Sequence, residues 1–356
     1  VPAAQVIGLK EGQGFKTAMK VLEKGRIHIA AICVGVAERM LEDALRYAID
    51  RKQFGQPIAS FGAIKYKIAE MATRIFASES AHYRAGQNID DTYDALVAGG
   101  MEAGKAKLKS LEEYAIECAI LKVHGSEVLD YVVDEGVQIY GGMGYSAEAP
   151  MERAYRDARI NRIFEGTNEI NRLLTIDMLL KRAMKGTIDL MTPAMAVQKE
   201  LMSIPDFTSS DDGGVFSKEK KVLNNLKKAG LMVAGAAVQK FMMKLSDEQE
   251  ILMNLADMLI EGYIAESTLL RVEKLIALRG EKACEIETAM ALIYLNHAME
   301  VAARAGREAV SSFAEGDELR MMLLGLKRFL KTDSYNLKNA RRKVADHLIE
   351  NGTKYY

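Results

Sequence analysis

The chain of 356 residues is long enough for about two domains of ordinary size. Its net charge of −1 comes from balanced acidic and basic residues without blocks of like charge, which argues against nucleic-acid binding. The three cysteines, Cys33, Cys118 and Cys284, lack the spacing of a zinc site or a disulfide framework. We therefore expect three buried thiols and no metal site. The most apolar window, residues 231–238, is far shorter than the roughly 20 residues of a membrane span.

The chain begins without methionine or a targeting peptide, so we expect a fragment whose beginning is missing. Residues 1–14 predict a short extended piece, and strand content is expected to end there. Apolar stripes at helical spacing predict a helix to about Asp50, a second one capped by Ser60, and a third from about Leu111 to Val137. A break is expected at Asp90-Asp91 and Gly99-Gly100. The stripes are Ile29, Cys33, Val36, Met40, Ala44 and Tyr47; Ile64, Ile68, Met71 and Ile75; and Leu111, Tyr114, Cys118 and Leu121.

Two glycine-rich segments interrupt the helical pattern. Residues 138–146 predict a loop, because each glycine in a helix costs about 1 kcal/mol. Residues 152–163 predict a short basic helix, 164–166 a turn, and Thr167 the N-cap of a helix that ends near Gly186. These elements together predict an all-α fold whose first part is an antiparallel four-helix bundle.

Beyond the bundle, residues 187–216 predict a linker, and 217–356 a second helical domain. Residues 246–249 fit a capping box for a helix carrying Leu252, Leu255 and Leu259. For the linker and residues 222–245, ordinary packing is favoured over contact with a membrane surface, because an interfacial helix needs a clean basic face. His297 is expected to be a core histidine and not a ligand.

Both glycine-rich segments could accommodate a ligand, and we expect them to border one cleft. Glycine lets backbone N–H groups approach a phosphate or a flat ring, and the helix after Gly166 directs its positive end toward the same place. From the residues alone, Glu165 is either a solvated turn carboxylate or a carboxylate with a shifted pKa. The sequence pattern leaves these alternatives open.

Several motifs, taken in order and spacing, closely resemble the acyl-CoA dehydrogenases over residues 1–185. They match the end of that family's middle β-domain (1–14) and its C-terminal helical domain (15–186). The motifs are Val6-Ile7-Gly8, Gly12-Gln13-Gly14-Phe15, Gly25-Arg26, Arg51-Lys52-Gln53-Phe54-Gly55, Gln138-Ile139-Tyr140-Gly141-Gly142-Met143-Gly144-Tyr145 and Arg162-Ile163-Phe164-Glu165-Gly166-Thr167-Asn168-Glu169-Ile170.

The resemblance implies that Glu165 is the general base that removes the α-proton of an acyl-CoA thioester, while the β-hydrogen passes to FAD as hydride. Other members carry the base at the position of Gly25, where this chain has no side chain. Arg26 and Gly166 are then expected near the substrate, although Arg26 alone could also be a helix-end salt-bridge partner.

The resemblance also implies the FAD contacts. Arg51, with its planar guanidinium, would meet the pyrophosphate of the neighbouring subunit's FAD. No contact is transferred to Phe61 or Gly62, which depart from the family pattern. The expected FAD contacts are Arg51, Gln53 and Phe54; Gln138, Ile139, Tyr140, Gly141 and Gly142; and Thr167, Asn168 and Glu169.

The additional domain resembles that of the very-long-chain members, which implies a homodimer and electron-transfer flavoprotein as a partner in fatty acid β-oxidation. An acyl-CoA oxidase is the alternative enzyme, although oxidases commonly have EGDN where this chain has Glu165-Gly166-Thr167-Asn168. A non-catalytic assembly or scaffold protein is the alternative from another class. The compartment stays open between bacterial cytoplasm and the mitochondrial matrix or inner-membrane face.

Overall fold

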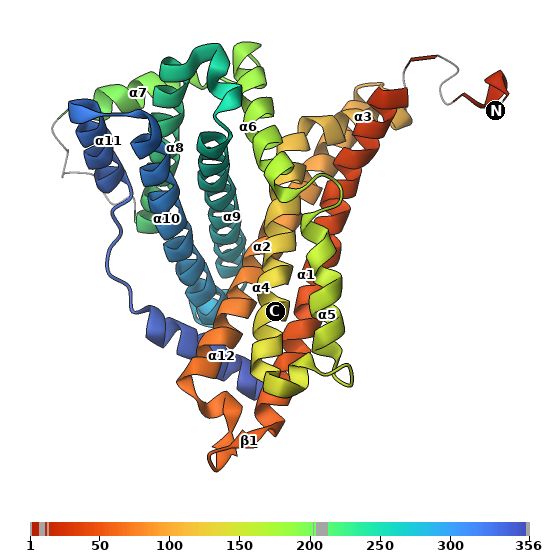
Figure 1. The fold of residues 1–356 in the computed structure, drawn as a ribbon, viewed down its shortest axis with the longest axis vertical. Coiled ribbons are helices and arrows are strands. Elements are labelled where there is room, and N and C mark those ends of the chain that lie inside the picture. The colour runs from red at the N-terminus through yellow and green to blue at the C-terminus, as the bar shows by residue number, and fades with distance from the viewer. Residues whose placement is uncertain (1, 7–10, 13, 202, 204–212, 354–356) are drawn as a thin grey trace.

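The computed structural model describes residues 2–6, 11–12, 14–201, 203 and 213–353, and these residues are almost entirely helical. Figure 1 shows two groups of helices side by side, one built from the first half of the chain and one from the second. The all-α fold class is confirmed. None of the described helices is both long and apolar enough to cross a membrane.

The first group is a bundle whose long helices alternate in direction along the chain, so α1 and α4 run the same way. Gly125 packs against Ala30 near their middles, and Tyr140 stacks on Tyr47 with ring centroids 4.0 Å apart where both helices end. Small buried side chains such as Cys33 allow this close approach. The elements are α1 (Gly14–Asp50), α2 (Gly62–Ala98), α3 (Ala103–Glu113), α4 (Ala115–Tyr140), α5 (Pro150–Arg159) and α6 (Asn168–Met184).

A small hairpin corrects the expectation that strands end before residue 14. Strands β1 (Lys52–Gln53) and β2 (Gln56–Pro57) pair antiparallel between α1 and α2, whereas the described part of 1–13 contains the short 3₁₀ helix η1 (Ala3–Gln5) and no strand. Phe54 and Gly55 form the two-residue turn with φ of 52° and 80°. Paired left-handed residues match the right-handed twist of the two strands in a hairpin.

Several predicted helix boundaries are wrong. Ser60 ends the short 3₁₀ helix η3 (Ile58–Ser60) and does not cap α2. Asp90 and Asp91 lie inside α2, where both are exposed and Asp91 accepts from the Gln87 amide at 2.7 Å. The predicted third helix divides at Tyr114, and α4 continues to Tyr140 before the 3₁₀ helix η4 (Gly141–Tyr145).

The second group includes a helix inside the predicted linker. Helix α7 (Met191–Leu201) tolerates Pro193 because the proline lies in its first turn, and Val197 is buried. Residues 202 and 204–212 lie outside the described part of the chain. The predicted capping box at 246–249 is wrong, since no side chain caps the helix that starts there. The remaining elements are α8 (Ser217–Phe241), η6 (Met242–Asp247), α9 (Gln249–Arg279), η7 (Glu281–Cys284), α10 (Glu285–Phe313), α11 (Gly316–Phe329) and α12 (Leu337–Asn351).

Three lysines of α8 form ion pairs with neighbouring helices. Lys220 binds Glu273 at 2.6 Å, Lys227 binds Glu266, and Lys228 binds a carboxylate of α7. The opposite face of α8 is buried within the second group of helices. These contacts favour ordinary packing of α8.

A buried polar cluster joins the two groups of helices. The Tyr294 hydroxyl of α10 donates to the Glu261 carboxylate of α9 at 2.8 Å and lies 2.8 Å from Nε2 of His124 on α4. His297 lies at the edge of this cluster, 3.9 Å from Glu261. Burial raises the pKa of Glu261 to about 7 and lowers the pKa values of His124 and His297 to about 3 and about 4. His297 is therefore part of a structural cluster.

Candidate active site

Glu165 lies in a strained turn. Its φ is 58°, a left-handed conformation that non-glycine residues rarely adopt, and Gly166 follows with φ of 82°. Such strain persists only where surrounding contacts enforce it, and it is concentrated at functional sites. Helix α6 begins directly after the turn, with the Thr167 hydroxyl accepting from the backbone N–H of Ile170 at 3.3 Å. The predicted N-cap is confirmed.

The side chain of Lys122 on α4 holds this turn from inside the protein. It is fully buried, and its Nζ donates to the backbone oxygen of Gly166 at 2.8 Å and to Oδ1 of Asn168 at 2.7 Å. Burial lowers the pKa of the Lys122 ammonium to about 8. Asn171 adds a second support from α6, donating to the backbone oxygens of Gly166 at 2.8 Å and Thr167 at 3.0 Å. The turn is therefore fixed through its backbone, which leaves the Glu165 side chain free to act.

The Glu165 carboxylate points at Gly25 of α1. A Cβ added at Gly25 would lie 2.7 Å from Oε2 of Glu165, and this buried oxygen has no hydrogen-bond partner within the described part of the chain. Arg26 follows in the same helix turn, only 4% exposed, with an unpaired Nε. Burial lowers the pKa of the Arg26 guanidinium, while the nearby charges of Glu23 and Glu165 favour its charged form. The structure thus brings Gly25, Arg26 and Glu165 together.

Replacing Gly25 by alanine is expected to displace the Glu165 carboxylate; if Glu165 is the base that the family resemblance implies, kcat should fall by about 100-fold, because small misplacements of a catalytic group have effects of that size. Gly35 provides the control, since it lies on the same helix and has open space around its Cβ direction. Gly35→Ala should leave kcat unchanged. Steady-state kinetics on the complete protein measure both variants, and equal kcat values for the two would contradict the tight contact at Gly25.

The second set of predicted residues lies at the other end of α1, beside the hairpin in Figure 1. Arg51 and Gln53 are exposed there, and Phe54 is 92% exposed at the hairpin tip. Gln138 is also exposed, whereas the side chain of Ile139 is buried in the bundle core. Any ligand contact of Ile139 would therefore use its backbone.

Tyr140, Gly141 and Gly142 complete this end of the bundle. The ring of Tyr140 stacks on Tyr47, and its hydroxyl donates to the backbone oxygen of Asp43 at 3.3 Å. Gly141, with φ of 60°, ends α4, and Gly142 is exposed beside it. The two glycines leave the backbone of this turn open to a ligand or a partner.

The expectation that both glycine-rich turns border one cleft is wrong. Lys122 contacts the Glu165 turn, and Gln138 lies sixteen positions further along α4, a rise of roughly 24 Å. Along α1 the distance from Gly25 to Asp50 is roughly 38 Å. Sequence reasoning took two similar glycine turns as neighbours, but the straight helices between them keep them apart.

The three residues after Gly166 differ in their roles. Thr167 caps α6, and Asn168 is buried with its amide donating to Ser126 and Glu127, each at 3.0 Å. Only Glu169 presents an exposed side chain. The side chain of Asn168 is engaged within the fold, so a cofactor contact from it would also be through the backbone.

The residues that support the turn are not evident from the sequence. Lys122, Asn171, Glu127 and Arg172 were not singled out, although a lysine within the apolar stretch before His124 is unusual enough to indicate a buried partner. Such a residue could have been flagged, but its partner more than 40 positions away could not.

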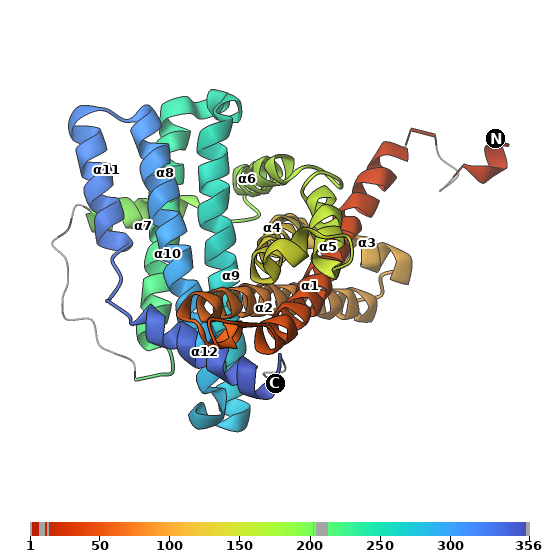
Figure 2. The ribbon, with the colours of Figure 1, turned by 60° about the horizontal axis from the view of Figure 1, so that its bottom comes forward.

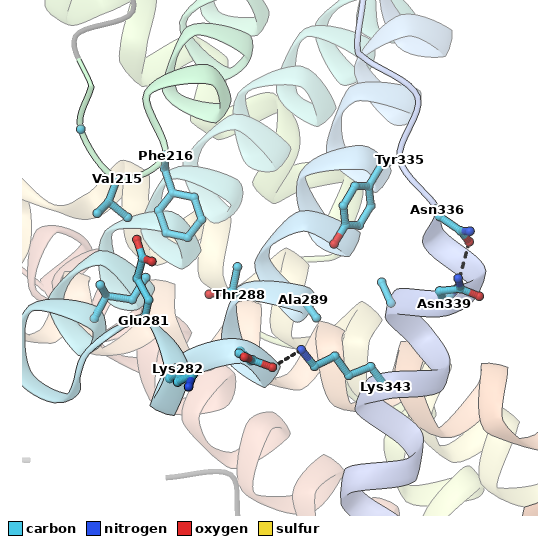
Figure 3. A pocket seen from close by; sticks show the side chains of 14 residues that line it. Val215, Phe216, Glu281, Lys282, Thr288, Ala289, Tyr335, Asn336, Asn339 and Lys343 are labelled. Atoms are coloured by element: carbon cyan, nitrogen blue, oxygen red, sulfur yellow. Dashed lines mark hydrogen bonds and ion pairs between the residues drawn. The ribbon is translucent and has the colours of Figure 1, made fainter.

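A separate pocket of about 710 Å³ lies among α9, η7, α10, α12 and the segments that directly precede α8 and α12. Figure 3 shows Phe216, Tyr335 and Lys343 around it, with Lys343 paired to Glu285. None of the predicted site residues lines this pocket. Within the described residues, no cluster of three histidine, cysteine, aspartate or glutamate side chains could hold a metal ion.

Comparison with known proteins adds independent evidence. Residues 12–180 and 225–328 each match a family model described as acyl-CoA dehydrogenase, C-terminal domain. A probable acyl-CoA dehydrogenase of Bacillus subtilis is 40% identical over 98% of this chain, which spans 58% of that relative. The rat mitochondrial very long-chain specific acyl-CoA dehydrogenase is 38% identical over 53% of this chain and 25% of its own length.

Among solved structures, an acyl-CoA dehydrogenase from Bacillus anthracis complexed with FAD superposes with a TM-score of 0.91. It is 41% identical, over 97% of this chain and 58% of the other. Both groups of helices are thus shared with one known protein. The chain belongs to the acyl-CoA dehydrogenase family.

Proposed function

We propose that this chain forms the base-bearing part of an FAD-dependent acyl-CoA dehydrogenase, with Glu165 removing the α-proton of a fatty acyl-CoA to give a trans-2-enoyl-CoA. The observation that supports this most directly is the Glu165 carboxylate, held in a strained turn with a buried, unpartnered oxygen. An orphaned carboxylate oxygen is costly unless a ligand uses it. A substrate carbon bearing the acidic proton is a partner of that kind.

The chemistry explains why the turn is rigid. A proton beside a thioester is weakly acidic, so the base must be positioned before the reaction and the charge on the thioester oxygen must be stabilised. Lys122 and Asn171 fix the backbone of residues 166–167. Gly25, which has no side chain, leaves the space that the Glu165 carboxylate occupies. The Glu165 carboxylate then holds the proton.

The surroundings of Glu165 fit a flat apolar cofactor and an acyl chain. Ile163, Phe164 and Ile170, which flank the turn in sequence, are 48%, 43% and 54% exposed. Exposed apolar side chains next in sequence to a carboxylate with an unpaired oxygen favour an apolar cover. FAD, when bound, supplies the acceptor for the β-hydrogen as hydride.

The distant hairpin supports the proposed homodimer. Arg51, Gln53, Phe54 and the 138–142 segment lie too far from Glu165 to serve the same flavin within one chain. Phe54, 92% exposed and held at φ of 52°, is an aromatic side chain placed for a partner. These residues would hold the FAD of the second subunit, with the Arg51 guanidinium facing its pyrophosphate.

The test uses the complete protein with FAD. We expect enoyl-CoA to form from saturated acyl-CoA with an artificial electron acceptor or electron-transfer flavoprotein, and an acyl-CoA series to define the preferred chain length. Peroxide formed without either acceptor would favour the oxidase alternative. Absence of bound flavin in the complete protein would favour a scaffold role and contradict the proposal.

A further inference from the structure

The second helical group contacts the base-bearing helix directly. Figure 2 shows α6 lying between α4 of the bundle and α9 of the second group. The Asp257 carboxylate of α9 accepts from Nε of Arg172 on α6 at 2.7 Å. One edge of the Arg172 guanidinium is therefore bound to the second group of helices.

The other edge of Arg172 faces the bundle. Its two terminal nitrogens donate to both carboxylate oxygens of Glu127 on α4, at 2.7 and 3.0 Å. Burial disfavours the charged guanidinium, but the hydrogen bonds and charges of Glu127 and Asp257 outweigh it and raise the pKa of Arg172. A planar guanidinium gripped on two edges has a fixed orientation.

Glu127 links Arg172 to the residues that hold the Glu165 turn. Its Oε1 also accepts from Nδ2 of Asn168 at 3.0 Å, and Oδ1 of Asn168 accepts from Nζ of Lys122 at 2.7 Å. Lys122 in turn holds the backbone oxygen of Gly166. An unbroken series of charge-assisted hydrogen bonds thus connects α9 with the residue after Glu165.

We infer that Asp257 is a positioning residue for the base, through which the additional helical group sets the Glu165 turn. The inference rests on the proposed function for its kinetic consequence. The series contains only short polar contacts, so a change at Asp257 alters the orientation of Arg172 and Glu127 before it alters the apolar packing between the groups. The additional group then serves the reaction directly as well as covering the bundle.

The test compares Asp257→Asn with Glu266→Gln in the complete protein with FAD. Glu266 also lies on α9 and also pairs with the bundle, through Arg84 at 3.0 Å, but it has no contact with the series. We expect Asp257→Asn to lower kcat by about tenfold with KM little changed, and Asp257→Glu to restore most of the loss. Glu266→Gln should keep the wild-type kcat.

Hydrogen exchange of residues 163–171 gives a second readout that does not depend on turnover. Faster exchange there in Asp257→Asn, but not in Glu266→Gln, supports the inference. Equal kcat and equal exchange in the two variants would overturn it, leaving Asp257 as a simple tie between helices. An inactive wild type whose turn still loosens in Asp257→Asn would instead count against the proposed dehydrogenase activity alone.

Discussion

Replacing Glu165 by glutamine is expected to lower kcat for acyl-CoA oxidation by about 10³-fold while the protein stays folded and keeps FAD. Glutamine has nearly the same shape but cannot accept the α-proton, and general-base catalysis contributes 10²- to 10⁴-fold. The fold should survive because Lys122 and Asn171 hold the turn through backbone atoms. Steady-state kinetics, the flavin absorbance spectrum and a melting curve measure the three properties.

Glu152→Gln provides the matched control for that experiment. Glu152 is a carboxylate of α5 whose partner is the exposed Arg156 of the same helix. Its loss should leave kcat unchanged. Full turnover in the Glu165→Gln protein would remove Glu165 as the base and with it the main support for the proposed reaction.

Replacing Lys122 by methionine should destabilise the fold and the site together. Hydrogen bonds to charged groups contribute about 1.5–3 kcal/mol each, and this change removes two, although Asn171 and Ser126 still donate to the same two acceptors. We expect the free energy of unfolding to fall by about 3 kcal/mol or more, and kcat to fall in the fraction that remains folded. Denaturant titration and kinetics below the melting range measure the two effects.

Lys67→Met is the control for Lys122, because Lys67 joins α2 to Glu135 of α4 through a partly exposed ion pair. The Lys67 side chain is 24% exposed and does not contact the Glu165 turn, whereas that of Lys122 is fully buried, so this variant should lose less stability and no activity. Equal losses of stability in the two variants would show that the buried amine has no special role in the turn.

The sequence predicts helices well where apolar spacing is unbroken and short-range chemistry decides the ends. Thr167 caps α6 as its side chain predicts, and the three cysteines are buried. Local sequence patterns failed where burial or backbone geometry determined the structure. Asp90 does not break α2 because it is exposed, and the turn at Phe54 needs two residues in the left-handed conformation, which the sequence does not predict.

The candidate site, too, could be predicted from the sequence only in part. Glu165 was singled out as the base only through family resemblance, since its local sequence alone favours a solvated turn carboxylate. Its strain and its contact with Gly25 depend on α1 and α4, which lie far from it in the chain. Asp257 is further still, and only the packing of the second group against α6 reveals its connection.

The cluster of Glu261, Tyr294, His124 and His297 affects how the contact between the two groups of helices depends on salt concentration. Between about pH 4 and about pH 7 these four side chains are neutral, given their pKa values. Dissolved ions weaken the attraction between charges that solvent reaches, such as the partly exposed Arg84 and Glu266, but have little effect on uncharged hydrogen bonds away from water. At mildly acidic pH and high salt concentration, the two groups of helices would therefore stay joined at this cluster after the ion pairs at their periphery had weakened.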